Sequence, residues 1–185
     1  IVMKRQAGGA KNPDDIFTNV YIREDEKPGH FRDAKEFSTL LNSCGRLNNA
    51  SLGIGACLGD KKQRSKALAS LMDYKKEIVS SMRWYKDHSA RQKSDRIIKG
   101  NNYIIINAKD NVLSTMIGTM ASMISKNIEM ESNIFVLSMA RNPDNTTKVS
   151  LRITGNPENV DLKSIVAELV AIIGGEAGGH QHAAG

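Results

Sequence analysis

The chain has 185 residues, of which 40% are hydrophobic and 25% are charged, as is typical of a globular protein. It holds no run of about eighteen apolar residues, so the sequence predicts neither a membrane span nor a membrane partner. Its two cysteines, Cys44 and Cys57, lack the spacing of a zinc or redox motif, which favours reduced thiols and a cytoplasmic location over a disulfide scaffold.

The positive charge is concentrated in one segment. Residues 61–99 hold twelve lysines and arginines against four acidic residues, so this segment carries +8 and the remainder −2 of the net +6. A basic segment on a near-neutral body favours a polyanionic partner, although a solvated basic helix face gives the same pattern.

The first part of the chain predicts helices after an irregular start. Turn signals over 1–31 indicate irregular structure, with one short strand at 20–22. From Asp33, apolar residues recur at helical spacing, and Gly45 is expected to end this helix just before Arg46. The last two elements expected in this part are a short helix or turn at 51–59 and a helix from 61 to about 90, long enough to connect two bodies.

From Tyr103 the pattern changes to alternating strands and helices. Continuous apolar runs indicate buried strands, and strict alternation before the last helix indicates a half-buried one. Asn111 and Gly174 are the expected caps of the two helices. The expected strands are 103–106, 134–137 and 147–153, and the expected helices are 113–124 and 162–173. We therefore predict an α/β fold, a mixed β-sheet flanked by helices and preceded by a long connecting helix.

The strand at 147–153 presents a candidate phosphate site. Its period of two places the apolar residues on one face and Lys148, Ser150 and Arg152 on the other. A guanidinium fork, a hydroxyl and an ammonium suit phosphate oxygens, whereas the alternative is an ordinary solvated sheet face.

The C-terminal residues 174–185 are rich in glycine and include His180 and His182. Glycine lets backbone approach a ligand closely, and uncovered N–H groups form an anion site. The alternative is a helix C-cap followed by an unstructured end. A histidine pair can bind metal, but no acidic or cysteine residues cluster near it, so the sequence favours a hydrogen bond to phosphate and predicts no metal site.

Several segments resemble one known family. The ending GGHQHAAG resembles the GGHxxAAG signature of the DHH-associated domain of DHH-family phosphoesterases, and KVSLR at 148–152 resembles its K-V-S-x-R strand. The stretches 33–46 and 51–60 resemble archaeal RecJ-like nucleases, and TMIGTMASM at 115–123 resembles their T-I-V-G-T-V-A-S-M helix. The resemblance runs in order over residues 32–185.

The resemblance implies a division of labour. In this family a DHH domain holds divalent metal, manganese or magnesium, that activates water against a phosphodiester, and the DHH-associated domain grips the substrate. The chain would then comprise the tail of a truncated DHH domain at 1–60, a basic connecting helix at 61–99 and a DHH-associated, substrate-binding domain at 100–185. We therefore expect this portion alone to bind no cofactor and to be inactive.

The resemblance also assigns site residues. It implies a terminal-phosphate pocket that adds Arg46 to the strand residues, and a glycine-histidine loop at the scissile region. The expected phosphate-binding residues are Arg46, Lys148, Ser150, Arg152, Gly178, Gly179 and His180. The residues expected to guide nucleic acid electrostatically are Lys62, Lys66, Lys75 and Lys76.

The function that this favours is the substrate-binding portion of a RecJ-like exonuclease acting on single-stranded DNA or RNA. One alternative is a non-catalytic replication scaffold that binds the GINS complex. Another is a phosphoesterase for short oligonucleotides, against which the archaeal-type LLNSCGR at 40–46 argues. The related C-terminal domain of alanyl-tRNA synthetase carries glycine runs but lacks the GGHxxAAG pattern.

Overall fold

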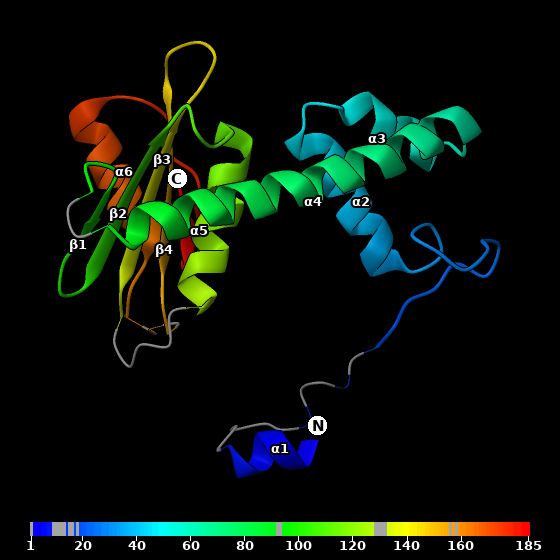
Figure 1. Cartoon of the computed structure of the whole chain (residues 1–185), viewed down its shortest axis with the longest axis horizontal. Coiled ribbons are helices and arrows are strands. Elements are labelled where there is room, and N and C mark those ends of the chain that lie inside the picture. The colour runs from blue at the N-terminus through cyan, green and yellow to red at the C-terminus, as the bar shows by residue number, and fades with distance from the viewer. Residues whose placement is uncertain are drawn as a thin grey trace. The chain divides into compact units, whose positions relative to one another are not determined.

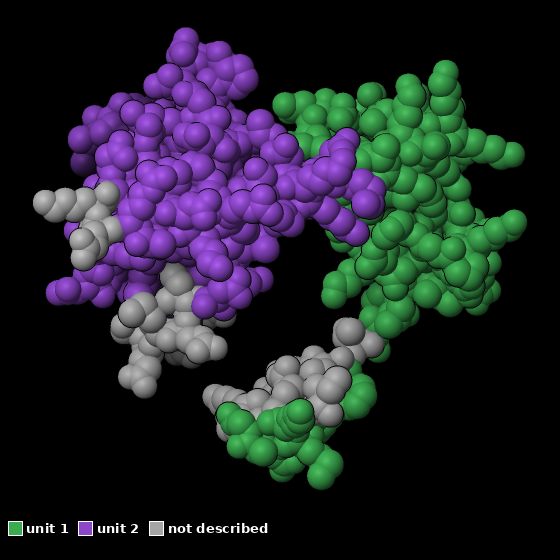
Figure 2. Space-filling view, viewed as in Figure 1, with its two compact units in different colours: residues 1–71 green, residues 72–185 purple. Residues whose placement is uncertain are grey.

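The computed structural model describes residues 2–8, 14, 17, 19–91, 94–127, 133–155, 157 and 159–185. The chain forms two compact units, residues 1–71 (unit 1) and 72–185 (unit 2), shown in two colours in Figure 2. The division falls within the long helix α4 (Lys61–Ser89), whose bounds confirm the helix expected from 61 to about 90. The three-part division at 60 and 99 stays a prediction.

Unit 1 opens differently from the sequence-based expectation. Residues Val2–Ala7 form helix α1, so irregular structure throughout 1–31 is wrong there. The expected strand at 20–22 is reduced to an isolated bridge between Ile22 and Asp33. The remaining part of this expectation, at residues 1, 9–13, 15, 16 and 18, lies outside the described residues.

Helix α2 (Ala34–Arg46) starts where the sequence indicates and ends later. The Asp33 carboxylate caps it by accepting hydrogen bonds from the backbone N–H groups of Lys35 and Glu36, at 2.8 and 3.0 Å. Gly45 does not end the helix, which includes Arg46. The left-handed residue that follows is Asn48, with φ 59°, because an asparagine side chain tolerates this conformation. Helix α3 (Ala50–Cys57) confirms the short helix expected at 51–59.

Unit 2 is built on a six-stranded mixed sheet in the order β1-β2-β3-β4-β6-β5 (Figure 1). Strands β2 and β3 are parallel and all other neighbours are antiparallel. The strands are β1 (Ile97–Lys99), β2 (Tyr103–Lys109), β3 (Phe135–Arg141), β4 (Thr147–Ile153), β5 (Gly179–His180) and β6 (Ala183–Ala184). The mixed sheet with flanking helices after a long helix confirms the predicted fold class. Strands β1, β5 and β6 were not expected, because two or three residues are too few to show a period.

Helices α5 (Ser114–Asn127) and α6 (Leu162–Ile173) cover opposite faces of the sheet (Figure 1). Helix α5 lies in the crossover connection that the parallel strands β2 and β3 require. Helix α6 packs on β4, β5 and β6. Asn111 is not the cap of α5, since its side-chain amide donates to the carbonyl of Ala108 at 3.1 Å. Gly174, with φ 80°, is the C-cap of α6 as expected.

The core of unit 2 fills both sides of the sheet. Below α6, Leu151 and Ile153 of β4 pack with Leu162 and Val166. On the α5 side the least exposed side chains are Ile106, Val136, Met116, Ile117 and Ile124. Strand β4 is therefore covered on both faces. The alternation predicts a half-buried strand with a solvated polar face, but Ser150 on that face is only 5% exposed. Among the described residues, every helix is too short or too polar to span a lipid bilayer.

Candidate phosphate-binding site

The polar face of β4 lies against helix α5. Alternation along the strand places Ser150 and Arg152 on the face opposite Leu151, and both lie close to Gly118 of α5. Ser150 is buried and Arg152 is half-buried, whereas Lys148 is exposed at the start of the strand. Lys148, Ser150 and Arg152 thus lie on one face of the strand as predicted, but helix α5 covers part of that face.

The guanidinium of Arg152 joins three elements. Its Nε donates to Ser122 Oγ of α5 at 2.8 Å, and its Nη1 donates to the carbonyls of Leu151, at 2.7 Å, and of Ala184 in β6, at 3.3 Å. Its Nη2 reaches the carbonyl of Gly118 at 3.5 Å, a long hydrogen bond. All four acceptors are neutral. These bonds hold the guanidinium in place against β4, α5 and β6.

Helix α5 approaches β4 closely because it has a glycine at the contact. A Cβ built on Gly118 would lie 3.2 Å from Arg152 Nη2 and 3.2 Å from Ser150 Oγ, tighter than ordinary van der Waals contact. One helical turn later, the Ser122 hydroxyl donates back to the Gly118 carbonyl at 2.9 Å. The glycine and the serine together form the wall that faces the two polar groups of β4.

The glycine-histidine loop expected at the C-terminus is a β-hairpin. Gly178 and Gly185 exchange two backbone hydrogen bonds of 3.0 Å, and residues 181–182 form the turn. The hairpin extends the sheet beside β4, because β6 pairs Ala183 with Arg152. Gly179 has φ 135°, where a Cβ would collide with the Ala183 carbonyl, so glycine is required for this turn of the backbone.

The hairpin uses some of its backbone groups and exposes others. The Gly178 N–H is committed to Gly185, whereas Gly179 follows as a non-hydrogen-bonded pair with Ala184, so its N–H lies on the outer edge of the sheet. His180 is exposed. The turn carbonyl of Gln181 accepts from the N–H of Leu162 at 2.8 Å, which ties the hairpin to the start of α6.

The structure brings together Ser150, Arg152 and the hairpin, and it places the other predicted residues elsewhere. Arg46, half-buried, is the last residue of α2 in unit 1, which is described separately. The lysines predicted to guide nucleic acid are all exposed on α4, with Lys62 and Lys66 in unit 1 and Lys75 and Lys76 in unit 2. Lys76 also forms an exposed ion pair of 3.0 Å with Asp73.

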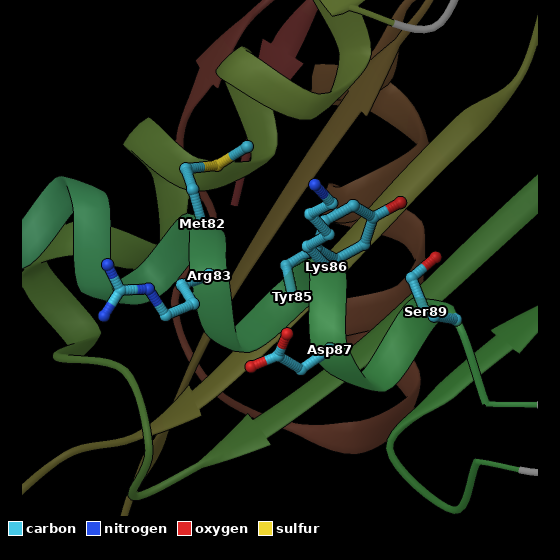
Figure 3. Close-up of a pocket in the computed structure, with 7 residues that line it drawn as sticks. Met82, Arg83, Tyr85, Lys86, Asp87 and Ser89 are labelled. Atoms are coloured by element: carbon cyan, nitrogen blue, oxygen red, sulfur yellow. The ribbon is translucent and has the colours of Figure 1, made fainter.

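A separate hollow of about 830 Å³ lies along the last turns of α4 in unit 2 (Figure 3). Figure 3 shows Arg83 and Lys86 extending from the helix toward different sides, and Asp87 brings a negative charge to the same lining. Because the two cations do not converge, this hollow is a weaker phosphate site than the β4 face. Its lining residues are Met82, Arg83, Tyr85, Lys86, Asp87, Ser89 and Ala90.

Metal ligands do not gather in the described part of the chain. No group of three or more His, Cys, Asp or Glu side chains lies close enough there to hold a metal ion. Cys44 is a buried free thiol and Cys57 an exposed one. The divalent metals of a DHH centre therefore do not fit these residues, and no hydrolytic step is assigned to them.

Sequence reasoning missed the roles of Gly118 and Ser122. Both lie in the 115–123 segment, and their i, i+4 spacing already places them on one face of a helix. The sequence gives no signal for which strand that face contacts. The pairing with Arg152 becomes visible only in the folded unit.

Comparison with known proteins finds a family match in the C-terminal part of the chain. The family model of the DHHA1 domain matches residues 100–185. No curated protein matches the chain. The match confirms the resemblance of this region to the DHH-associated domain of the DHH phosphoesterases, and the likeness to archaeal RecJ-like nucleases stays a prediction.

Proposed function

From the premise that residues 100–185 carry a DHHA1 domain, we propose that this chain is the substrate-gripping portion of a RecJ-like exonuclease and binds the phosphate-bearing end of a single-stranded nucleic acid. The observation that carries the proposal is the Arg152 guanidinium, held by neutral oxygens of α5, β4 and β6 beside Ser150. A cation fixed in this way is preorganised for an anionic ligand.

The chemistry of the β4 face suits a phosphate group. A guanidinium attracts phosphate oxygens by its positive charge, and a serine hydroxyl adds a hydrogen-bond donor. Lys148 lies four residues from Arg152, about 13 Å along an extended strand, so it suits a second phosphate further along the same nucleic acid. This arrangement favours an oligonucleotide over a single phosphate as the ligand.

The C-terminal hairpin adds hydrogen-bond donors to the proposed phosphate site. The exposed Gly179 N–H at the sheet edge and the exposed His180 ring offer donors next to the β4 site, and the glycine at 179 keeps the edge open. In the full enzyme, hydrolysis would rely on manganese or magnesium held by a DHH domain. Binding is the role proposed for the residues described.

The exposed lysines of α4 extend the proposal to a longer strand. Each lysine that neutralises a phosphate releases a counterion, so binding weakens as salt rises. We expect the double variant Lys75→Ala/Lys76→Ala to lower the salt slope of binding by about one to two and to weaken all sequences equally. The phosphate-binding role expected for Arg46, which lies in unit 1, stays a prediction.

The test is binding of the full chain to fluorescent single-stranded oligonucleotides with and without a terminal phosphate. We expect the wild type to prefer the phosphorylated strand. Arg152→Ala should weaken that binding by about 1–3 kcal/mol, or about five- to 150-fold, because charge-assisted hydrogen bonds are lost. Equal affinity of the wild type for both strands would overturn the proposal.

Arg141→Ala is the matched control. Arg141 lies at the end of neighbouring strand β3, is 50% exposed and sits 3.6 Å from the Asp110 carboxylate, so its charge already has a partner. The variant removes the same amount of positive charge from the sheet without touching the β4 site. A loss of phosphate preference equal to that of Arg152→Ala would mean that net charge, rather than a site, selects the ligand.

A further inference from the structure

The α5 segment 115–123 has a face whose function is not explained by core packing alone. Met116, Met120 and Ile124 of this helix are buried in the core of unit 2, as an amphipathic helix requires. Gly118 and Ser122 lie one turn apart and face β4 instead. They make polar contacts with the residue proposed to bind phosphate.

We propose that Ser122 is a positioning residue that, together with Gly118, fixes the orientation of Arg152 for phosphate. The inference rests on the proposed function, and it adds that phosphate binding requires residues of α5 that orient Arg152. Without this α5 wall, the Arg152 guanidinium would lose its fixed orientation.

The hydrogen bonds of Ser122 have a defined direction. A serine hydroxyl has one proton, and here it is donated to the Gly118 carbonyl at 2.9 Å. The oxygen lone pairs then point away from that bond and accept the Arg152 Nε–H at 2.8 Å. Because the guanidinium is planar and rigid, the short bond at Nε helps to fix which edge of the group is turned toward α5.

Gly118 supplies the space that this orientation needs. A Cβ at this position would come within 3.2 Å of both Arg152 Nη2 and Ser150 Oγ, the two groups proposed to face the phosphate. A larger residue would therefore push the guanidinium and the hydroxyl off their positions. Ser122 thus supplies a fixed hydrogen-bond acceptor, and Gly118 supplies a position without a side chain next to it.

The alternative is that Ser122 only returns a hydrogen bond to its own helix, as many helical serines do. Ser125 provides the matched control, because its hydroxyl donates to the Ser122 carbonyl at 3.2 Å in the same helix and is similarly half-buried. Both serines back-bond to α5. The bond from Arg152 Nε is made to Ser122.

The experiment measures phosphate preference, the ratio of dissociation constants for the dephosphorylated and the 5′- or 3′-phosphorylated strand, in the full chain. We expect Ser122→Ala to lower this ratio about three- to tenfold and Ser125→Ala to leave it unchanged. Gly118→Ala should lower it further. Thermal unfolding of each variant shows whether the fold is kept, and if Gly118→Ala fails to fold, Ser122→Ala carries the test.

A spectroscopic readout separates orientation from stability. The Arg152 Nε–H signal in an ¹H–¹⁵N spectrum, assigned by its loss in Arg152→Lys, should shift and exchange faster with solvent in Ser122→Ala. The Ser125→Ala spectrum should keep it. An unchanged Nε–H signal, or an unchanged phosphate preference, in a folded Ser122→Ala protein would overturn the inference.

The two proposals fail in different ways. If the wild-type chain has no phosphate preference, the proposed function fails before Ser122 is considered. If the wild type prefers phosphate and Arg152→Ala abolishes that preference while Ser122→Ala keeps it, the phosphate site stands and the positioning role of Ser122 is wrong.

Discussion

Arg64 in unit 1 and Arg152 in unit 2 are both partly buried arginines held by several bonds, but their acceptors differ in charge. Arg64 makes a two-pronged ion pair with Glu26, with Nη2–Oε1 at 2.7 Å and Nη1–Oε2 at 3.2 Å. Its guanidinium carbon also lies 4.8 Å from the centre of the Phe31 ring. Arg152 is held by one hydroxyl and three carbonyl oxygens.

The difference separates a structural arginine from one suited to a ligand. A carboxylate partner cancels the charge of Arg64, so the pair serves the packing of unit 1. The four hydrogen bonds of Arg152 named above go to neutral oxygens of the strand and helix that form the proposed phosphate site. Two partly buried arginines can thus be held by different kinds of acceptor.

The largest expected effect is on the stability of unit 1. Arg64→Met should lower the free energy of unfolding by about 2–3 kcal/mol, because Glu26, with a side chain only 16% exposed, loses its main partner. Denaturant unfolding measures the loss, and faster labelling of buried Cys44 locates it in unit 1. Arg23→Met is the control, since the Arg23 side chain is 38% exposed and its surface ion pair with Asp25 should contribute much less to stability. Equal losses in the two variants would contradict the comparison.

A smaller loss of stability is expected in unit 2. Arg152→Met should cost about 1–2 kcal/mol, because the Ser122 hydroxyl and the Leu151 carbonyl each lose a hydrogen bond. Circular dichroism during thermal unfolding measures it. A cost above that of Arg64→Met would show that Arg152 is chiefly a structural residue and would remove the contrast on which the phosphate site depends.

The smallest effects concern two exposed carboxylates, one in each unit. The pKa of Asp25 is held below its usual 3.8 mainly by a hydrogen bond from the Arg23 guanidinium. The pKa of Asp161 is held below the same value mainly by a hydrogen bond from the Ser164 hydroxyl. A folded-state pKa below the unfolded one gives stability above pH 3.8 that is lost as the pH falls through the folded pKa.

Salt should distinguish these two carboxylates in an NMR titration. About 1 M salt screens the Arg23 charge, so the pKa of Asp25 should rise toward its usual value. The pKa of Asp161 should change less, because its main partner, Ser164, is neutral. Ser164→Ala should instead raise the pKa of Asp161 at any salt concentration. Equal salt responses would show that neighbouring charge dominates at both sites.

Most elements of unit 2 follow from the sequence because burial imposes a period on it. Strand β4 has the predicted bounds, and α6 runs from Leu162 to its glycine cap as predicted. Strands β2 and β3 extend beyond the predicted runs because their last residues are held by ladder hydrogen bonds rather than by hydrophobicity. Gly45 failed as a stop signal, since a glycine permits a helix end without requiring one.

The candidate site, too, was only partly predictable from the sequence. The sequence places Ser150 and Arg152 on one face of a strand, and the alternation in the structure agrees. It does not reveal that α5 covers that face, because a helix facing a covered strand and a helix facing solvent have the same period. Nor does it reveal the hairpin, whose pairing depends on β4 as a partner.

The sequence by itself determined the helices, the main strands, the fold class and the DHHA1 character of residues 100–185, because hydrophobic period and local motifs are written along the chain. Only the tertiary structure decided that Arg152 would meet Ser122, Gly118 and the C-terminal strand. These groups are about thirty residues apart, and hydrogen bonds at that separation depend on how the sheet and α5 pack rather than on any local pattern.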